Sequence, residues 1–261
     1  MPSVGRLIEE AEKAFNSVER QNQLNQWNRI ARYMLPNQSG LFHAKEVKGS
    51  IKTEVLFDST AIHANRDLAN ALQSILINPA LKWGKAKIKD DELNKDSEVR
   101  KYLESASDKV LSALAASNFY PEAARAFPFL TSMGNMILHQ EEIDPDNPKF
   151  VNFNFKAIHL ANVAWLENHL GIPDKLFHKY EYTLRQIDEK FGNIPESLAK
   201  AYKESPDQVQ NVLMSLYPDK GEDTYTATYI EMETQEILKT CLLYTSPSPR
   251  DRTRSRMPSS A

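Results

Sequence analysis

The sequence predicts an α+β fold, with amphipathic helices first and antiparallel strands afterwards. Apolar residues recur at intervals of three and four as far as Met133, and the period shortens toward two beyond Gly134. Clusters of Pro, Asn, Asp and Gly separate the later segments, as turns between strands require. The 261 residues, 41% of them hydrophobic, suffice for a buried core in one or two domains. We therefore expect a mainly helical part over residues 1–133 and a mainly antiparallel part over residues 134–240.

Four helices are expected in the first part, over residues 7–34, 58–77, 97–117 and 121–133. Asp58 stands at the N-cap position of the second helix, and Asn118 suits a left-handed residue at the end of the third. Because Pro128 lacks a backbone N–H, it should kink the fourth helix. The third helix should turn these side chains toward the core: Val99, Leu103, Ala106, Val110, Leu111 and Leu114.

The strands expected from period-2 patterns cover residues 135–140, 150–155, 158–167, 172–182, 209–217 and 225–232. A further short strand fits residues 81–88, ahead of the third helix. Gly171 marks a hairpin between the third and fourth of the later strands. A helix over residues 184–191 follows Thr183 and ends at Gly192, and another spans residues 196–203.

The last 21 residues, 241–261, change composition abruptly. Residues 241–251 read CLLYTSPSPRD, which resembles the translation of a transposon-type sequencing-library adaptor. We expect residues 241–261 to be a non-native tail, and a natural Ser/Arg/Pro-rich tail is the alternative. The tail holds the chain's one Cys, so residues 1–240 offer no disulfide framework or thiolate metal site. An adaptor at this point would also mean that the reading frame is truncated.

Charge and motif content argue against most enzyme classes. The net charge is −3, and it becomes −6 over residues 1–240, because the tail carries four Arg and one Asp. Such a chain lacks the general attraction to DNA that a basic protein has. Phosphate-binding loops, nucleophile elbows and zinc motifs are absent, and the six His are scattered, so we expect no catalytic residue, cofactor or metal. No apolar run reaches membrane-spanning length, so we expect an unexported protein with no membrane partner.

Two groups of charged residues remain as candidate binding sites. Glu141, Glu142, Asp144 and Asp146 offer carboxylates for a hard cation, as in a metal-dependent nuclease, although Pro145 and Pro148 favour a solvated turn. A second group alternates along the expected strand: Lys82, Lys85, Lys87 and Lys89. These lysines would suit a DNA-binding module that contacts phosphates, and equally they would protect a strand edge from pairing.

Three segments, in order along the chain, carry a resemblance to a known family. The first is Trp27-x-x-Ile30-x-x-Tyr33-x-x-Pro36. The second runs from Asp58 through Ala64-x-x-x-Leu68-Ala69-x-x-Leu72 to Pro79-x-x-x-Trp83. The third is Ser117-Asn118-Phe119-Tyr120 followed by Gly134-Asn135-Met136-x-Leu138. In these segments the sequence resembles the head-to-tail connector, or portal, proteins of short-tailed double-stranded DNA bacteriophages, with Pro128 and residues 160–165 departing from the family pattern.

The resemblance implies a structural virion protein that catalyses nothing itself. Portal subunits form a ring, usually of twelve copies, at one capsid vertex, through which DNA is packaged and ejected. The implied partners are further copies of the chain, the terminase, scaffold and capsid proteins, tail adaptor proteins and the double-stranded DNA in the channel. The implied location is the virion, after assembly in the host bacterial cytoplasm. Residues 1–240 would correspond to the N-terminal wing region, without the stem, clip and crown.

Large aromatic side chains in the matched segments are the candidate packing or interface residues. They are Trp27, Tyr33, Trp83 and Tyr120. Aromatic residues dominate the energetics of cores and of protein interfaces alike, so the sequence leaves both roles open for each.

Overall fold

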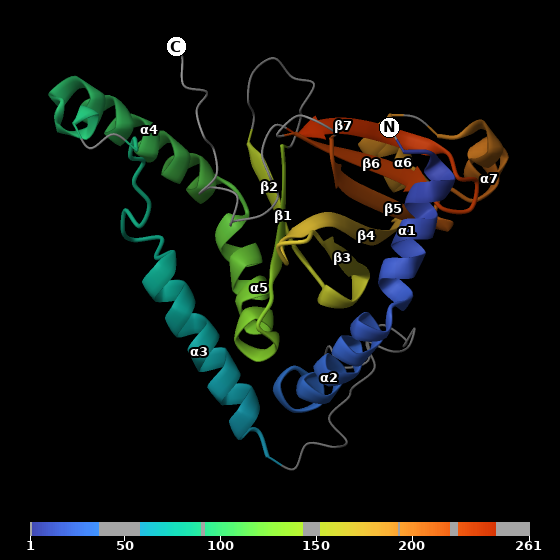
Figure 1. Cartoon of the computed structure of the whole chain (residues 1–261), viewed down its shortest axis with the longest axis horizontal. Helices are drawn as coiled ribbons and strands as arrows, with labels where there is room; N and C mark the ends of the chain where they lie inside the picture. Colours follow the sequence, from blue (N-terminus) through green and yellow to red (C-terminus); the bar gives the residue numbers. More distant parts are fainter. Residues whose placement is uncertain are drawn as a thin grey trace. The chain divides into compact units, whose positions relative to one another are not determined.

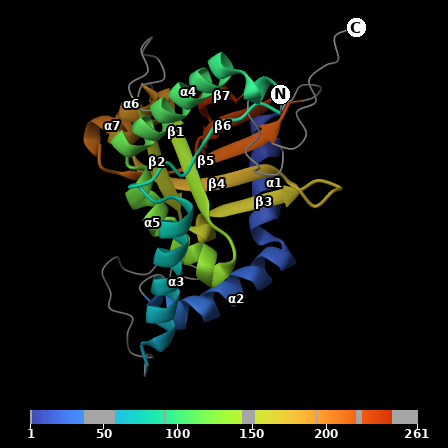
Figure 2. The same ribbon diagram turned by 90° about the vertical axis from the view of Figure 1, so that its left-hand side faces the viewer.

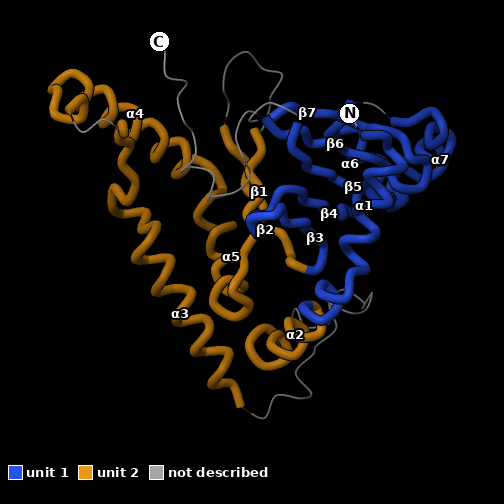
Figure 3. Tube along the Cα trace, in the orientation of Figure 1, with its two compact units in different colours: residues 1–23, 161–261 blue, residues 24–160 orange. Residues whose placement is uncertain are grey.

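A computed structural model of the chain describes residues 2–36, 58–89, 92–142, 152–192, 194–219 and 224–243. Helices precede antiparallel strands along the chain, which confirms the α+β class (Figures 1 and 2). The chain divides into two compact units (Figure 3). Unit 1 comprises residues 1–23 and 161–261, and unit 2 comprises residues 24–160.

Unit 1 is built on a five-stranded antiparallel sheet in the order β3-β4-β5-β6-β7. Its strands are β3 (Val163–Glu167), β4 (Pro173–Thr183), β5 (Val209–Pro218), β6 (Tyr225–Glu231) and β7 (Ile237–Leu243). The hairpin expected at Gly171 is confirmed, since β3 pairs with β4 and Gly171 has φ 69°. The expected strand 158–167 is shorter, because a 3₁₀ turn, Leu160–Asn162, precedes β3.

Successive residues of the strands face two different cores, as the two-residue period of a strand requires. On one face, Phe177, Leu213 and Ile230 pack with the apolar side of helix α1 (Val4–Asn16). On the other face, Tyr180, Val212 and Tyr229 pack with α6 (Leu184–Phe191). Residues of η4 (Glu196–Leu198) and α7 (Ala199–Glu204) join this second core. Unit 1 is thus a sheet covered by helices on both faces.

The caps of α6 match the sequence expectation. The Thr183 side chain accepts a hydrogen bond from Gln186 N, and the Gln186 side chain accepts one from Thr183 N, which forms a capping box. Gly192 ends the helix in the left-handed region at φ 65°. Local signals at both ends therefore sufficed to predict this helix.

The single helix expected over residues 7–34 is wrong, because the chain breaks at Ser17. Ser17 has the extended angles φ −61° and ψ 148°, and α2 (Val18–Met34) begins directly after it. The Ser17 hydroxyl donates to Ala14 O at 3.3 Å and accepts from Arg20 N at 3.2 Å. A serine hydroxyl can therefore bind the end of α1 and the start of α2 at once.

Strand β7 is not among the expected strands: residues 237–240 show no strand pattern that we recognised, and residues 241–243 belong to the expected non-native tail. The strand continues to Leu243, and Cys241 pairs with Ala227 of β6. The first three residues of the expected non-native tail therefore extend an existing strand. The origin of residues 241–261 stays a prediction about the gene.

Unit 2 is formed by helices α3 (Thr60–Leu76), α4 (Ser97–Ala116) and α5 (Phe119–Met133), most of α2, and the antiparallel pair β1 (Ile137–Glu142) and β2 (Phe153–Ile158). The small core between α3 and α5 contains Ala69, Ala123 and Phe127. The buried Asn65 of α3 accepts a hydrogen bond from Thr131 Oγ1 at 2.7 Å. Asn65 Nδ2 also donates to the carbonyl of Pro128, which lies inside α5 as expected. These polar contacts fix how α3 lies along α5.

Three local expectations for unit 2 are wrong. All residues of α4 are described and none is buried, so the face predicted to enter the core stays at least partly exposed. Within the described stretch 58–89, residues 81–88 form no strand, since Ala86 N donates to Ser107 Oγ of α4 and Ile88 N donates to Asn94 Oδ1. Side chains thus satisfy the backbone groups that a strand partner would have bound. Asn118, with φ −84°, is not left-handed and instead precedes α5.

Candidate functional site

An aromatic cluster in unit 2 brings together two of the four candidate residues. Trp83 Nε1 donates a hydrogen bond to the Tyr120 hydroxyl at 3.1 Å. The Trp83 ring stacks on Phe119 with centroids 6.0 Å apart, and Phe119 meets Phe155 edge-on at 5.1 Å. The cluster therefore joins the segment after α3, the first turn of α5 and strand β2. Offset and edge-on aromatic pairs of this kind add stability beyond the area that they bury.

Asn118 holds the start of α5 against the outer edge of β2. Its Oδ1 accepts from Phe155 N at 2.7 Å, and its Nδ2 donates to Phe155 O at 2.7 Å and to Asn154 Oδ1 at 3.0 Å. One side-chain amide thus binds both backbone groups of Phe155, as a neighbouring strand would. An edge strand whose polar groups are satisfied in this way is protected from pairing with another chain.

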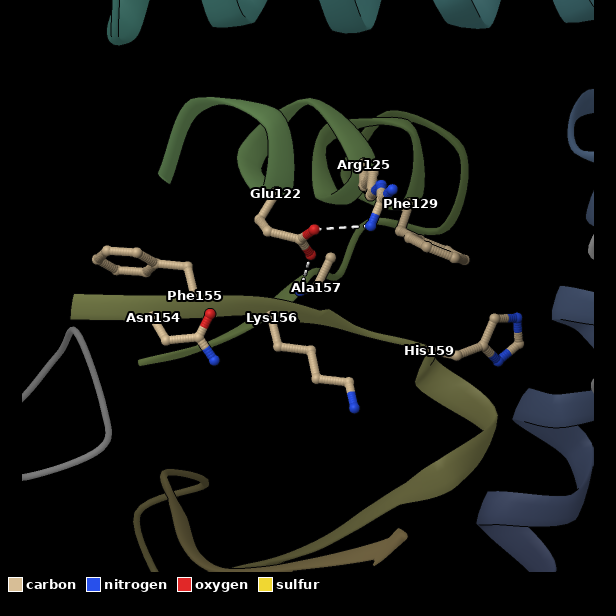
Figure 4. Close-up of a pocket in the computed structure, with 8 residues that line it drawn as sticks. All are labelled: Glu122, Arg125, Phe129, Asn154, Phe155, Lys156, Ala157 and His159. Atoms are coloured by element: carbon tan, nitrogen blue, oxygen red, sulfur yellow. Dashed lines mark hydrogen bonds and ion pairs between the residues drawn. The ribbon is translucent and has the colours of Figure 1, made fainter. Parts of the chain in front are cut away.

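Glu122, one turn further along α5, continues this contact (Figure 4). Its Oε2 accepts from Ala157 N at 2.8 Å, and its Oε1 binds Arg125 Nη1 at 2.7 Å. The Glu122 carboxylate is nearly buried, whereas Arg125 is mostly exposed. The lining of the adjoining hollow of about 540 Å³ also includes Phe129, Asn154, Lys156 and His159.

His159 lies at one end of this hollow, edge-on to Phe129 at a centroid distance of 5.3 Å (Figure 4). Burial lowers the pKa of His159 from 6.5 to about 4, because desolvation penalises the charged imidazolium. The ring is therefore neutral at pH 7. A neutral histidine beside Lys156 and Arg125 adds no positive charge to the site at that pH.

Replacing Asn118 with alanine tests its role as a link between α5 and β2. The backbone N–H and C=O of Phe155 would lose their side-chain partner, so we expect the free energy of unfolding to fall by about 2 kcal/mol. Denaturant unfolding measures this loss, and amide hydrogen exchange at Phe155 should accelerate. Asn154→Ala removes only an exposed partner of Asn118 and should change stability by less than about 0.5 kcal/mol. Equal losses in the two variants would contradict the assignment.

The other two aromatic candidates differ in how much of each side chain is exposed. Trp27 is 3% exposed and belongs to the core, whereas Tyr33, six residues later on α2, is 55% exposed. Tyr33 is thus available for contact with another molecule, and Trp27 is not. The role of Tyr33 as an interface residue stays a prediction.

The four lysines do not share one strand face. Lys82 forms an ion pair with Asp108 of α4 at 2.7 Å, and the neighbouring Trp83 contacts Tyr120. Lys85, Lys87 and Lys89 are exposed on the irregular segment that follows. The segment is held in place by α4 through Ser107 and by Asn94. The contact of these four lysines with nucleic acid stays a prediction.

The structure describes two of the four acidic residues that the sequence offers as a cation site. Glu141 and Glu142 lie in β1, whereas Asp144 and Asp146 lie outside the described residues. Among the residues that the structure describes, no three His, Cys, Asp or Glu side chains gather where they could hold a metal ion. Within the same residues, no helix is long and apolar enough to cross a bilayer.

The residues that bind β2 to α5 are not among the candidates that the sequence indicates. The sequence predicts Asn118, in Ser117-Asn118-Phe119-Tyr120, at the end of the preceding helix, whereas it precedes α5. Asn118 and Glu122 are four residues apart and therefore share one helix face. Their spacing was a usable signal, but their partners on β2 are more than 30 residues away in the sequence.

Comparison with known proteins gives one family and two relatives. A family described as "Bacteriophage head to tail connecting protein" matches residues 8–247. A "Probable portal protein" of Bordetella phage BPP-1 is 22% identical over 174 residues, which cover 67% of this chain and 30% of that protein. A "Portal protein" of Salmonella phage epsilon15 is 22% identical over 187 residues, covering 72% and 32%. The matches thus span about a third of each relative. Because the family match covers most of the sequence, the chain belongs to the bacteriophage head to tail connecting proteins.

Proposed function

We propose that the chain is the N-terminal wing region of a portal protein, a structural subunit of the ring at one capsid vertex. The observation that carries this proposal is the family match over residues 8–247, supported by two relatives that are named as portal proteins. The α+β fold and the residues that link α5 to β2 fit a rigid structural element. In this role the chain has no catalytic function of its own.

The proposed ring holds twelve copies and encloses the channel through which double-stranded DNA enters and leaves the head. Its partners are the terminase during packaging, scaffold and capsid proteins around it, and tail adaptor proteins after packaging. The ring assembles in the host bacterial cytoplasm and becomes part of the virion. The net charge of −6 over residues 1–240 suits a wall past which DNA slides, because phosphate contacts would add adhesion that depends on salt.

Electron microscopy of the complete portal protein that this region is proposed to belong to tests this function. We expect closed rings with a central channel, because a head-to-tail contact whose rotation closes produces a ring. Size-exclusion chromatography with light scattering gives the mass of the same particle independently. A monomer that persists at high protein concentration would contradict the proposal.

A further inference from the structure

Acidic groups are unevenly divided between the two compact units. Over its whole length, unit 1 holds 15 Lys and Arg against 19 Asp and Glu, a net charge of −4. Unit 2 holds 17 Lys and Arg against 16 Asp and Glu, a net charge of +1. Unit 1 thus carries the excess of carboxylates, and lysines that another copy presents to it would be attracted.

Two exposed lysines of unit 2, Lys85 and Lys87, define what we call the basic surface, with Leu81 nearby and 66% exposed. The backbone between the two lysines is fixed, since Ala86 N donates to Ser107 Oγ at 2.9 Å. Lys82, by contrast, is already paired with Asp108. A held backbone lowers the cost of ordering this segment in a contact, whereas each lysine side chain still loses rotamer freedom.

The acidic surface of unit 1 combines the turn between β6 and β7 with the start of η4. It consists of Glu233 and Glu236 in the turn and Glu196 in η4, beside Ile237, which is 49% exposed. The Glu236 carboxylate accepts from Ser197 Oγ at 3.1 Å, and Ser197 directly follows Glu196, so this bond joins the two segments. The fully buried Glu231 fixes the turn, because its carboxylate accepts from Glu233 N at 3.0 Å and from Thr234 N at 2.6 Å. Both surfaces thus combine charge, an exposed apolar side chain and a held backbone.

We propose that the basic surface of one copy binds the acidic surface of the next copy. This inference rests on the proposed ring, because a ring contact joins two different surfaces of identical subunits. A second copy fits better than DNA, since duplex binding draws on many phosphate contacts, whereas this segment offers only the exposed Lys85, Lys87 and Lys89 among the described residues, on an acidic chain. Attraction between the lysines and the glutamates sets which surface of one copy faces which surface of the next. The apolar residues Leu81 and Ile237 add contact area.

Zero-length cross-linking tests the contact directly. A concentrated 1:1 mixture of ¹⁴N- and ¹⁵N-labelled chains is treated with a carbodiimide, which couples lysine amines to carboxylates, and the peptides are identified by mass spectrometry. We expect mixed-isotope peptides that join Lys85 or Lys87 to Glu196, Glu233 or Glu236, with yields that fall as salt rises toward about 0.5 M. Cross-links of these lysines only within one copy, or to other carboxylates, would overturn the proposal.

A charge swap separates the contact from a general effect of charge. Lys85→Glu with Lys87→Glu should weaken self-association in sedimentation velocity by about tenfold, because like charges then face each other. Adding Glu233→Lys and Glu236→Lys to the same chain should restore it. Lys101→Glu with Lys109→Glu, on exposed residues of α4, is the matched control and should leave self-association nearly unchanged. Failure of the swap to restore association, or an equal loss in the control, contradicts the proposal.

Two further results distinguish this contact from its alternatives. Rings of the full-length protein that persist in the Lys85→Glu and Lys87→Glu variant would overturn the contact and leave the portal function standing. Mixed-isotope cross-links from a protein that never forms rings would support the contact and count against the portal function. Filter retention of duplex DNA at low salt that disappears in Lys85→Gln with Lys87→Gln would assign these lysines to DNA and overturn the contact.

Discussion

Replacing Trp27 with alanine should lower the free energy of unfolding by about 3 to 5 kcal/mol, the usual cost of truncating a buried large aromatic side chain. Trp27 is 3% exposed, so its removal leaves a cavity that the surroundings fill only in part. Tyr33→Ala, on the same helix but 55% exposed, should change the free energy of unfolding by less than about 0.5 kcal/mol. The pair thus compares a core aromatic with a surface aromatic on one helix.

Denaturant unfolding followed by far-ultraviolet circular dichroism measures both effects without depending on tryptophan fluorescence. Similar losses in the two variants would contradict the assignment of Trp27 to the core and Tyr33 to the surface. If Tyr33 instead serves as an interface residue, its substitution should weaken self-association while leaving the unfolding of the dilute protein unchanged.

Acidification should destabilise the protein through His159. Burial lowers its pKa to about 4 in the folded chain, against 6.5 for an ordinary histidine. The folded state therefore favours the neutral ring, and the unfolded state takes up the proton first as the pH falls. The stability contribution is fully present above about pH 6.5 and is lost between about pH 6.5 and 4, in total about 3 kcal/mol.

Unfolding curves recorded between pH 7 and 4 measure this dependence. His159→Gln cannot take up the proton and should flatten the decline over that range. His169→Gln, which changes an exposed histidine in unit 1, should leave the decline as it is in the unsubstituted chain. A decline that is unaffected by His159→Gln would show that other groups cause the acid sensitivity.

Elements with strong local signals were predictable from sequence. Thr183 and Gly192 predicted the two ends of α6, and the turn at Gly171 predicted the β3–β4 hairpin. The break at Ser17 left a signal in the hydrophobic spacing that the expectation of one continuous helix ignores. The buried residues Leu24, Trp27 and Ala31 of α2 do not continue the helical register of the buried residues of α1. Spacing also placed the apolar face of α4 in the core, although no residue of this described helix is buried. Hydrophobic periodicity predicts that a helix has an apolar side. Whether other elements of the fold cover that side depends on tertiary packing.

The candidate site was only partly predictable. The four aromatic residues were chosen by type and motif, and the structure joins Trp83 to Tyr120 while leaving Tyr33 exposed. The alternation of Lys82 to Lys89 suggested a strand, yet Ser107 and Asn94 bind backbone groups of that segment. Contacts between residues that are distant in sequence, such as Asn118 with Phe155, have no local signature.

The proposed portal function places this chain at the junction between phage head and tail. Immunogold electron microscopy checks that position, with antibodies against residues 2–36 and 58–89 applied to gently disrupted virions of the phage that encodes the chain. We expect gold at a single vertex, where the tail attaches. Gold spread over the whole capsid, or confined to the distal end of the tail, would rule this position out.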